Sequence, residues 1–410
     1  MFYRLHHDCR LVKGASRGAI YDLQSGKVYS INRGAREILS ACQEHPLAAV
    51  VDSNNPDNEC YLKFLDRLTA KKIGALYTYE PEIKTTALPA APVTLDFLWL
   101  ELTANCNNRC LHCYATSGPC QQEADLVPHE RWLQLITEAR QAGATALQLI
   151  GGEPLMYKKW QELVLKAETE GFNFIEIFTN ATLIDDTCVA FLQQHHVNVA
   201  TTIYADNADI HDRITQHPGS FEKTMAAIKK ILAADIPLRI ASIIMKTNEQ
   251  QADNIMKLCE KLGVEITPPD VVRPTGRGDD RTLLPEHYAR PPIKPPFHTD
   301  AESFTKAQQY HSCLAGKIAV TADGNIIPCI FARSQMCGNI ITSSLAEILN
   351  GTPLQQCWYT TKDQVEKCRD CEYRYACADC RPLAQGSDPQ KNWLACSCGC
   401  NYNPYTGIWE

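Results

Sequence analysis

Several features are missing from the 410-residue sequence, and each absence excludes a class of protein. No apolar run reaches the roughly 20 residues that a bilayer-spanning helix needs, so we expect no membrane partner. Residues 1–7 lack the charged-then-apolar pattern of a signal peptide, which predicts a cytoplasmic protein. Lysine and arginine (40) are fewer than aspartate and glutamate (47), and the net charge of −7 argues against a nucleic-acid partner.

Two common catalytic patterns are also missing from the sequence. It contains no P-loop for binding nucleotide phosphates, and the spacing of its residues suggests no Ser/His/Asp triad. We therefore assign no catalytic residue of these kinds and look for the chemistry among the cysteines.

Cysteine is abundant, with twenty residues in the chain. In a small secreted protein this number would indicate a disulfide framework, but this chain is long and expected to be cytoplasmic. Eleven of the twenty lie between Cys313 and Cys400, and three others form the close group Cys106, Cys110 and Cys113. Such short spacings indicate metal binding, either by iron–sulfur clusters or by zinc.

Residue patterns divide the chain into three expected domains, residues 1–85, 93–284 and 297–410. The first is predicted to be a small α+β unit, because two strand-like runs joined by a turn are followed by two helical patterns. A Pro/Ala-rich linker over residues 85–92 and a proline-rich loop over residues 285–296 separate the units.

The middle unit alternates strand and helix patterns, which predicts a parallel α/β sheet. Its six predicted strands cover residues 95–102, 146–150, 174–179, 197–204, 238–245 and 264–273. The unit is shorter than the about 250 residues of a closed eight-stranded barrel, so a partial (β/α)6 TIM-like barrel is expected.

Candidate functional residues follow these strands, at the edge where parallel α/β folds place their active sites. The cysteine group follows the first strand, and Gly151-Gly152-Glu153-Pro154 follows the second. Thr179-Asn180 lies at the end of the third strand, Thr202 and Tyr204 lie at the end of the fourth, and Arg273 with Gly276-Arg277 follows the sixth. The cysteines alone leave two interpretations open, a four-iron cluster with one open iron or a zinc site completed by His112. The glycine-rich segment one βα unit later favours the cluster.

With these motifs, residues 93–280 resemble the radical SAM enzymes. The resemblance implies that Cys106, Cys110 and Cys113 hold a [4Fe–4S] cluster whose open iron chelates S-adenosylmethionine (SAM). It also implies that the Gly151–Pro154 segment lines the methionine amino group and that His112 lies at the adenine edge, which removes it as a zinc ligand. The SAM-binding residues expected on this basis are His112, Gly151, Gly152, Glu153, Pro154, Thr179, Asn180, Thr202 and Arg273.

Residues 297–410 resemble the SPASM extension of peptide-modifying radical SAM enzymes, which binds two auxiliary [4Fe–4S] clusters. Spacing alone leaves zinc and iron–sulfur sites equally open here. By their order in the family, Cys313, Cys329 and Cys380 are expected to hold the first auxiliary cluster. The second is expected to use Cys368, Cys371 and Cys377, with a fourth ligand from among Cys396, Cys398 and Cys400.

Two departures from the SPASM pattern concern the first auxiliary cluster. Only two residues separate Cys377 from Cys380, where three are usual. Ala319 occupies the position at which the family frequently has an extra ligand. The first auxiliary cluster is therefore expected either to have an open iron or to recruit Cys337 or Cys357.

Together the resemblances imply an enzyme that modifies a ribosomally made precursor peptide through hydrogen abstraction by a 5′-deoxyadenosyl radical. The outcome is expected to be a crosslink or backbone excision. Residues 1–85 resemble a winged-helix-like peptide-recognition element, although a structural cap fits the same pattern. A flavodoxin or ferredoxin is the expected reducing partner, and a leader-binding partner protein is compatible with the pattern. The alternatives are sulfatase-maturase-like oxidation of a protein Cys or Ser, and a non-catalytic metal or electron-transfer protein.

Overall fold

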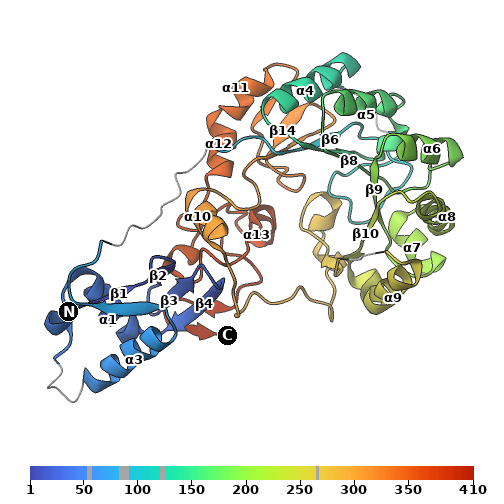
Figure 1. Cartoon of the computed structure of the whole chain (residues 1–410). Helices are drawn as coiled ribbons and strands as arrows, with labels where there is room; N and C mark the ends of the chain where they lie inside the picture. The colour runs from blue at the N-terminus through green and yellow to red at the C-terminus, as the bar shows by residue number, and fades with distance from the viewer. Residues whose placement is uncertain (53–57, 83–91, 121–125, 265–266) are drawn as a thin grey trace.

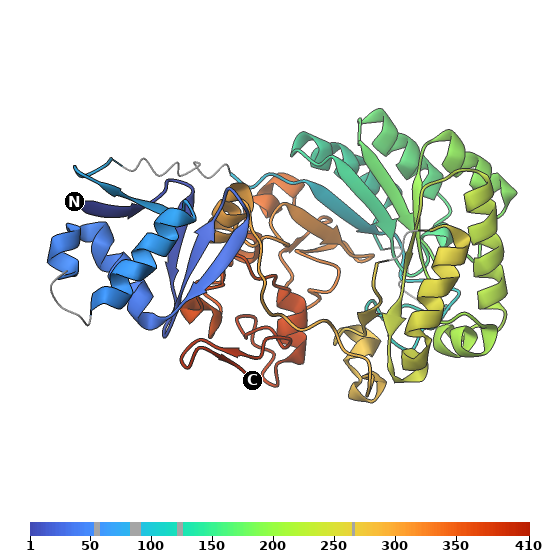
Figure 2. The same cartoon turned by 60° about the horizontal axis from the view of Figure 1, so that its bottom comes forward.

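The computed structural model describes residues 1–52, 58–82, 92–120, 126–264 and 267–410. The cysteine-rich C-terminal part lies between an N-terminal α+β part and a barrel-like part (Figure 1, Figure 2). Of the linker predicted over residues 85–92, only residue 92 belongs to the described residues. No helix among the described residues is long and apolar enough to cross a membrane.

The N-terminal part combines two small antiparallel sheets with helices. Strands β1 and β5 form one sheet, and β2, β3 and β4 form the other in that order. Asn32 caps the first helix by accepting a hydrogen bond from the backbone N–H of Ala35 at 2.9 Å, and Gly26 forms the β3–β4 turn at a φ of 72°. The elements are β1 (Phe2–Leu5), β2 (Cys9–Lys13), β3 (Gly18–Asp22), β4 (Lys27–Ile31), α1 (Arg33–Glu44), α2 (Leu47–Val50), α3 (Glu59–Ala70) and β5 (Gly74–Tyr77).

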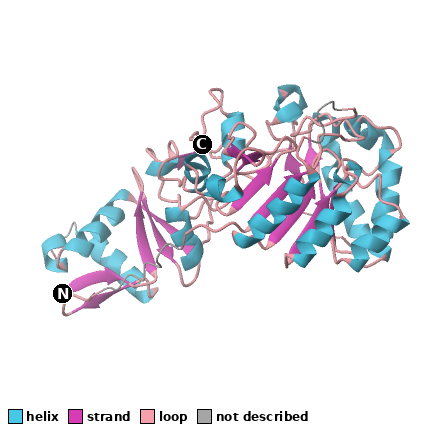
Figure 3. Ribbon diagram, turned by 90° about the horizontal axis from the view of Figure 1, so that it is seen from above, coloured by secondary structure: helices cyan, strands magenta, loops and turns pink. Residues whose placement is uncertain are grey.

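The barrel-like part contains five parallel strands with helices on the outer face (Figure 3). Leu98, Leu100, Leu147 and Leu149 are fully buried beneath those helices, against side chains such as Trp132. The strands are β6 (Phe97–Glu101), β7 (Ala146–Ile150), β8 (Phe174–Phe178), β9 (Asn198–Thr202) and β10 (Leu238–Ala241). The helices are α4 (His129–Gln141), α5 (Trp160–Thr169), α6 (Asp186–Gln194), α7 (Ala208–Thr215), α8 (Ser220–Ala233) and α9 (Ala252–Leu262). The prediction of a parallel α/β partial barrel is confirmed.

The sixth predicted strand differs from the expectation. Of residues 264–273, only β12 (Asp270–Val271) is a strand, and it pairs with β11 (Ile243–Ile244) in a separate two-stranded sheet. Residues 265–266 lie outside the described residues. Pro268 and Pro269 have no backbone N–H to donate, so this stretch cannot form a continuous ladder.

The cysteine-rich part extends the barrel sheet on its other side. Strand β13 (Lys317–Val320) runs parallel to β6, and β14 (Asn325–Ile327) and β15 (Gly338–Asn339) add antiparallel to it. The eight strands therefore form one sheet in the order β10-β9-β8-β7-β6-β13-β14-β15. Trp358, the last residue of α12 (Thr352–Trp358), connects that helix to the sheet, because it is buried and its indole N–H donates to the carbonyl of Lys317 at 3.0 Å.

The remaining elements are short and leave most cysteines on loops. The α-helices and strands are α10 (Ala301–Gln309), α11 (Leu345–Leu349), α12 (Thr352–Trp358), α13 (Arg381–Ser387), β16 (Tyr402–Asn403) and β17 (Ile408–Trp409). The 3-10 helices are η2 (Pro154–Met156), η3 (Lys246–Gln251), η4 (Gly276–Asp279), η5 (Arg281–Leu283) and η6 (Cys368–Asp370).

Leu98 tests the central position of β6, which pairs with both β7 and β13. We expect Leu98→Ala to lower the free energy of unfolding by about 2–5 kcal/mol, because the lost side chain leaves a cavity in a fully buried site. The control, Leu165→Ala on α5, removes a side chain that is 41% exposed and should change stability by less than about 0.5 kcal/mol. Urea denaturation measures both, and equal effects would contradict this placement of the core.

Candidate active site

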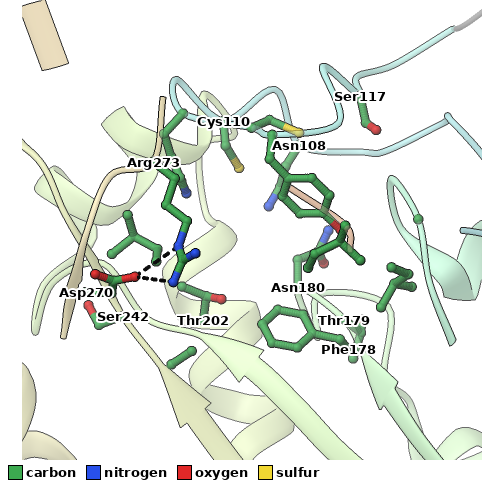
Figure 4. Close-up of a pocket in the computed structure, with 18 of the residues that line it drawn as sticks. Asn108, Cys110, Ser117, Phe178, Thr179, Asn180, Thr202, Ser242, Asp270 and Arg273 are labelled. Carbon is green, nitrogen blue, oxygen red and sulfur yellow. Dashed lines mark hydrogen bonds and ion pairs between the residues drawn. The ribbon is translucent and has the colours of Figure 1, made fainter. Parts of the chain in front are cut away.

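A cavity of about 750 Å³ lies at the carboxyl ends of the parallel strands (Figure 4). It brings together residues from the loops that follow β6, β7, β8, β9 and β12. The predicted site residues that line it are Cys106, Cys110, His112, Cys113, Gly151, Gly152, Thr179, Asn180, Thr202 and Arg273. Glu153 and Pro154 are buried and do not line it.

The loop that carries the three cysteines is held from two sides. The backbone N–H groups of Arg109 and Leu111 donate to the carbonyls of Thr215 and Ile214 at the end of α7, at 2.9 and 3.0 Å. On the other side, the Arg277 guanidinium donates to the carbonyls of Cys110 (2.9 Å) and Ser117 (2.7 Å). The loop is therefore fixed by the protein itself, with its thiols turned to one cavity.

The three thiols are suited to binding a metal cluster. Burial raises the pKa of Cys106 well above its usual value and that of Cys110 to about 12, and the nearby thiol of Cys113 adds to both shifts. A thiolate is stable there only beside a compensating cation, such as the iron of a cluster. Asn180 Nδ2 lies 3.8 Å from Cys106 Sγ, as a polar neighbour of that ligand.

Glycine at position 152 allows the loop after β7 to lie against the cysteine loop. Its backbone N–H donates to the Thr103 carbonyl at 2.7 Å, and a Cβ atom at this position would overlap the carbonyl oxygen of Asn105. The next residue, Glu153, accepts hydrogen bonds from the Thr179 hydroxyl (2.6 Å) and the Asn180 backbone (2.8 Å), and burial raises its pKa to about 7. Glu153 thus braces the ends of β7 and β8, and its direct contact with SAM stays a prediction.

His112 presents an unpaired polar atom at the cavity. Its ring lies edge-on to Tyr204 with centroids 5.0 Å apart, and Nδ1 has no hydrogen-bond partner among the described residues. Burial lowers its pKa to about 4, so the imidazole is neutral near pH 7. A buried nitrogen in this state fits the adenine edge of a nucleoside. Tyr204, a candidate at the end of the fourth predicted strand, lines the cavity and lies in hydrogen-bond contact with the Cys110 thiol.

Arg273 contacts the first auxiliary cysteine set as well as the cavity. Its guanidinium pairs with Asp270 at 2.9 Å (Figure 4). It also donates to Cys380 Sγ at 3.2 Å and lies over the Phe331 ring at 4.4 Å. The charges of Cys313, Cys329 and Cys380 act on one another, so these three thiols are neighbours. Arg273 therefore lies between the cavity and this set.

Cys337 lies beside Cys357. Its thiol contacts that of Cys357, and both side chains are buried in the main hydrophobic core. The expected recruitment of Cys337 or Cys357 as a ligand stays a prediction. Ala319 lies within β13 and is fully buried.

The second auxiliary set brings together five thiols. Cys368 Sγ lies 3.8 Å from Cys396 Sγ, and Cys400 contacts Cys396. The thiols that interact in this set are Cys368, Cys371, Cys377, Cys396 and Cys400, whereas Cys398 is exposed. The buried ammonium of Lys362 contacts Cys377, and no motif in the sequence indicated it.

Comparisons with known proteins agree with this geometry. Residues 100–261 match the model of the radical SAM superfamily, and residues 313–372 match SPASM, an iron–sulfur cluster-binding domain. The chain therefore carries a radical SAM domain over residues 100–261 and a SPASM domain over residues 313–372. It is an enzyme whose cofactors are SAM, a SAM-binding [4Fe–4S] cluster and auxiliary iron–sulfur clusters.

The proteins to which the chain is similar have different activities. The chain is 27% identical to the AdoMet-dependent heme synthase of Methanosarcina barkeri, over 69% of this chain and 90% of that protein. It is also 27% identical to the sporulation killing factor maturation protein SkfB of Bacillus subtilis, over 62% of this chain and 64% of that protein. Among solved structures, Streptococcus suis SuiB bound to SAM matches with a TM-score of 0.60 at 14% identity, over 97% of this chain and 99% of that one.

Gly152 tests the contact between the two loops. We expect Gly152→Ala to displace the cysteine loop, because the new methyl group overlaps the Asn105 carbonyl. Iron bound after anaerobic reconstitution should fall by about four per chain, the content of one [4Fe–4S] cluster. Gly34→Ala is the matched control, since its Cβ meets Tyr61 at an ordinary 3.4 Å. Full iron content in Gly152→Ala would contradict the close packing of the loops.

Arg273 tests the contact with the first auxiliary set. We expect Arg273→Gln to lower the midpoint potential of that cluster, because a cationic donor to a ligand sulfur stabilises the reduced, more negative state. Arg273→Lys keeps the charge and should restore part of the shift. EPR-monitored redox titration measures the potential, and an unchanged value in Arg273→Gln would show that the contact does not act on the cluster.

Proposed function

We propose that this enzyme modifies a ribosomally made precursor peptide in the cytoplasm, forming a crosslink or excising part of the backbone. The observation that carries the proposal is that one cavity is lined by residues next to two of the proposed cluster sites. The cavity is lined both by residues of the Cys106–Cys113 loop and by Arg273, Ile330 and Phe331, which lie next to the first auxiliary cysteines. A substrate residue in the cavity is thus in reach of both proposed cluster sites.

Part of the relatives supports a peptide substrate, while others are heme synthases. SkfB is a maturation protein by name, and SuiB has been solved bound to the precursor peptide SuiA. The SuiA-bound structure matches 95% of this chain with a TM-score of 0.58, so the likeness in fold extends beyond the barrel. The sequence alignments cover 69% of the chain for the heme synthase and 62% for SkfB, so their lengths do not separate the two activities.

The residues of the cavity have distinct roles in the proposed reaction. When bound, the cluster and SAM supply a 5′-deoxyadenosyl radical that removes a hydrogen atom from a substrate carbon. Cys106, Cys110 and Cys113 would hold the cluster, and neutral His112 would accept or donate a hydrogen bond at the adenine. The aromatic side chains of Phe97, Trp99 and Phe178 line the cavity and would shield a bound substrate from water.

A pair of charged residues shapes the floor of the same cavity. Glu176 is buried and accepts hydrogen bonds from Gln148 and from Arg239, the latter at 2.6 Å. The Arg239 guanidinium lies 5.5 Å from the centroid of the Phe178 ring. This network fixes the rotamers that face the substrate and so orients the residue under attack.

We further propose that the N-terminal unit binds the leader of the precursor peptide. Strand β4 is an edge of its sheet, and β3 is its only sheet neighbour among the described residues, apart from a single bridge between Lys27 and His298. An edge with unpaired backbone groups accepts an added strand. A flavodoxin or ferredoxin is the proposed source of electrons.

Anaerobic reconstitution tests the proposed function. We expect about twelve irons per chain, from three [4Fe–4S] clusters, and 5′-deoxyadenosine on addition of SAM and a reductant. Mass spectrometry of a candidate precursor after coexpression should show loss of two hydrogen atoms for a crosslink, or a larger loss for excision.

The control is Cys106→Ala/Cys110→Ala/Cys113→Ala, which should abolish 5′-deoxyadenosine formation and the mass change. Action on a leaderless Cys or Ser motif of a folded protein would replace the peptide proposal with sulfatase-type maturation. Bound zinc in place of iron, without cleavage of SAM, would contradict the assignment of this chain as a radical SAM enzyme.

A further inference from the structure

The N-terminal sheet lies against the loop that carries the second auxiliary cysteines (Figure 2). The backbone N–H of Ala15 donates to the Asp370 carbonyl at 2.8 Å, and the Tyr21 hydroxyl donates to the Glu372 carbonyl at 2.8 Å. In the opposite direction, Arg374 donates to the Lys13 carbonyl at 2.9 Å. The three loop residues in these hydrogen bonds, Asp370, Glu372 and Arg374, lie between Cys368 and Cys377. The docking contacts and the proposed ligands therefore share one short segment.

Glu372 is the buried centre of this contact. Its side chain is fully buried, and one carboxylate oxygen accepts from the Tyr402 hydroxyl at 2.5 Å. Arg17 of the N-terminal part lies 4.0 Å from the same oxygen. Gly14 passes so close that a Cβ atom there would lie 2.7 Å from the other carboxylate oxygen. The segment around Gly14 and Arg17 therefore packs closely against Glu372 of this loop.

Apolar side chains join the same two parts. Val12, Ala19 and Tyr21 form one buried cluster with Phe304, Tyr373 and Tyr402, and the Tyr21 and Phe304 rings lie 5.0 Å apart. Two proposed cluster ligands, Cys371 and Cys400, pack against this cluster. Ser16 adds a hydrogen bond from its hydroxyl to the Pro404 carbonyl at 2.6 Å, four residues after Cys400.

Loop order links the metal site to the docking contact. From Cys368 to Cys377 the only regular structure is the short η6, so ordering this segment costs conformational entropy. Iron ligation by thiolates contributes free energy only when the ligands are fixed in place. The same fixed loop then offers its backbone groups and Glu372 to the N-terminal sheet.

We propose that the second auxiliary cluster fastens the N-terminal unit to the rest of the enzyme. Cluster assembly orders the Cys368–Cys377 loop, and the ordered loop docks residues 12–21. Because linkage is reciprocal, docking in turn favours retention of the cluster. The inference rests on the proposed ligand set but not on a peptide substrate, so it can fail or hold independently of the modification reaction.

Hydrogen exchange in the reconstituted full-length enzyme, without SAM or peptide, tests the coupling. Cys377→Ser removes a ligand that is not part of the apolar contact. It should raise exchange of the Ala15 and Ser16 amides, which donate to Asp370 and Pro404, on the order of tenfold. Cys329→Ser, which removes a ligand of the first auxiliary set, is the matched control and should leave these amides protected.

The readouts separate the ways in which the proposal can fail. Iron analysis must show that each variant lost about four irons, and full iron in Cys377→Ser would overturn the ligand set on which the proposal rests. Loss of iron with unchanged exchange at Ala15 and Ser16 would overturn the coupling itself. Exchange of α5 amides in the barrel is the reference, and a rise there equal to that at Ala15 would indicate general unfolding and equally contradict a local fastener.

A second variant changes the N-terminal side of the contact with Glu372 instead of a cysteine ligand. Gly14→Val places side-chain atoms against Glu372 without touching a cysteine, and it should speed the release of iron from the second auxiliary cluster to a chelator, with the same order of change as in the exchange experiment. Gly34→Ala on α1 is the control. Unchanged release in Gly14→Val, with docking shown to be broken by exchange, would contradict the proposal.

Discussion

The parallel pairing of β13 with β6 is the contact on which the rest of the arrangement depends. Leu98 of β6 lies beside Ile318 of β13, and both are fully buried in the core of one sheet. Cys106 follows β6, whereas Cys313 and Cys329 flank the β13–β14 hairpin. One run of strand hydrogen bonds therefore sets the position of the first auxiliary cysteines relative to the SAM-binding loop, and backbone pairing of this kind is stiff.

Burial of the thiols explains why the cofactors and the fold depend on each other. The pKa of Cys106 is raised by burial, so its thiolate needs iron, while the loop around it is held by Arg277 and by the end of α7. The second auxiliary loop also has little regular structure, with the short η6 as its one helix, and it is held by contacts with the N-terminal sheet. The two loops are thus fixed by different parts of the protein, the first by the barrel and the second by the N-terminal unit.

Local patterns in the sequence predicted most elements of the barrel. Strand β7 has the predicted bounds. Cys313, Cys329 and Cys380 are neighbours in the structure, as are Cys368, Cys371 and Cys377, and their roles as cluster ligands stay predictions. Periodicity reports which face of a segment is buried, and the spacing of cysteines reports a shared metal, so both signals are local.

Contacts between distant segments were beyond these signals. The addition of β13 to the sheet, the Cys337–Cys357 contact and the hydrogen bond from Arg273 to Cys380 join residues that no motif connects. The brace formed by Glu153 was also missed, because a glutamate in a glycine-rich turn gives no sign of whether it faces a ligand or a neighbouring strand. Such side-chain directions depend on tertiary packing.

EPR spectroscopy of the reduced enzyme with and without SAM tests the central claim most directly. The measurement is made on a variant that lacks Cys313, Cys329, Cys368 and Cys377, so that only the cluster at Cys106, Cys110 and Cys113 contributes. The account predicts a [4Fe–4S]⁺ signal whose g-values shift when SAM is added, because SAM binds the open iron at the cavity. A signal that SAM leaves unchanged, or the absence of any iron signal at this site, would contradict the account.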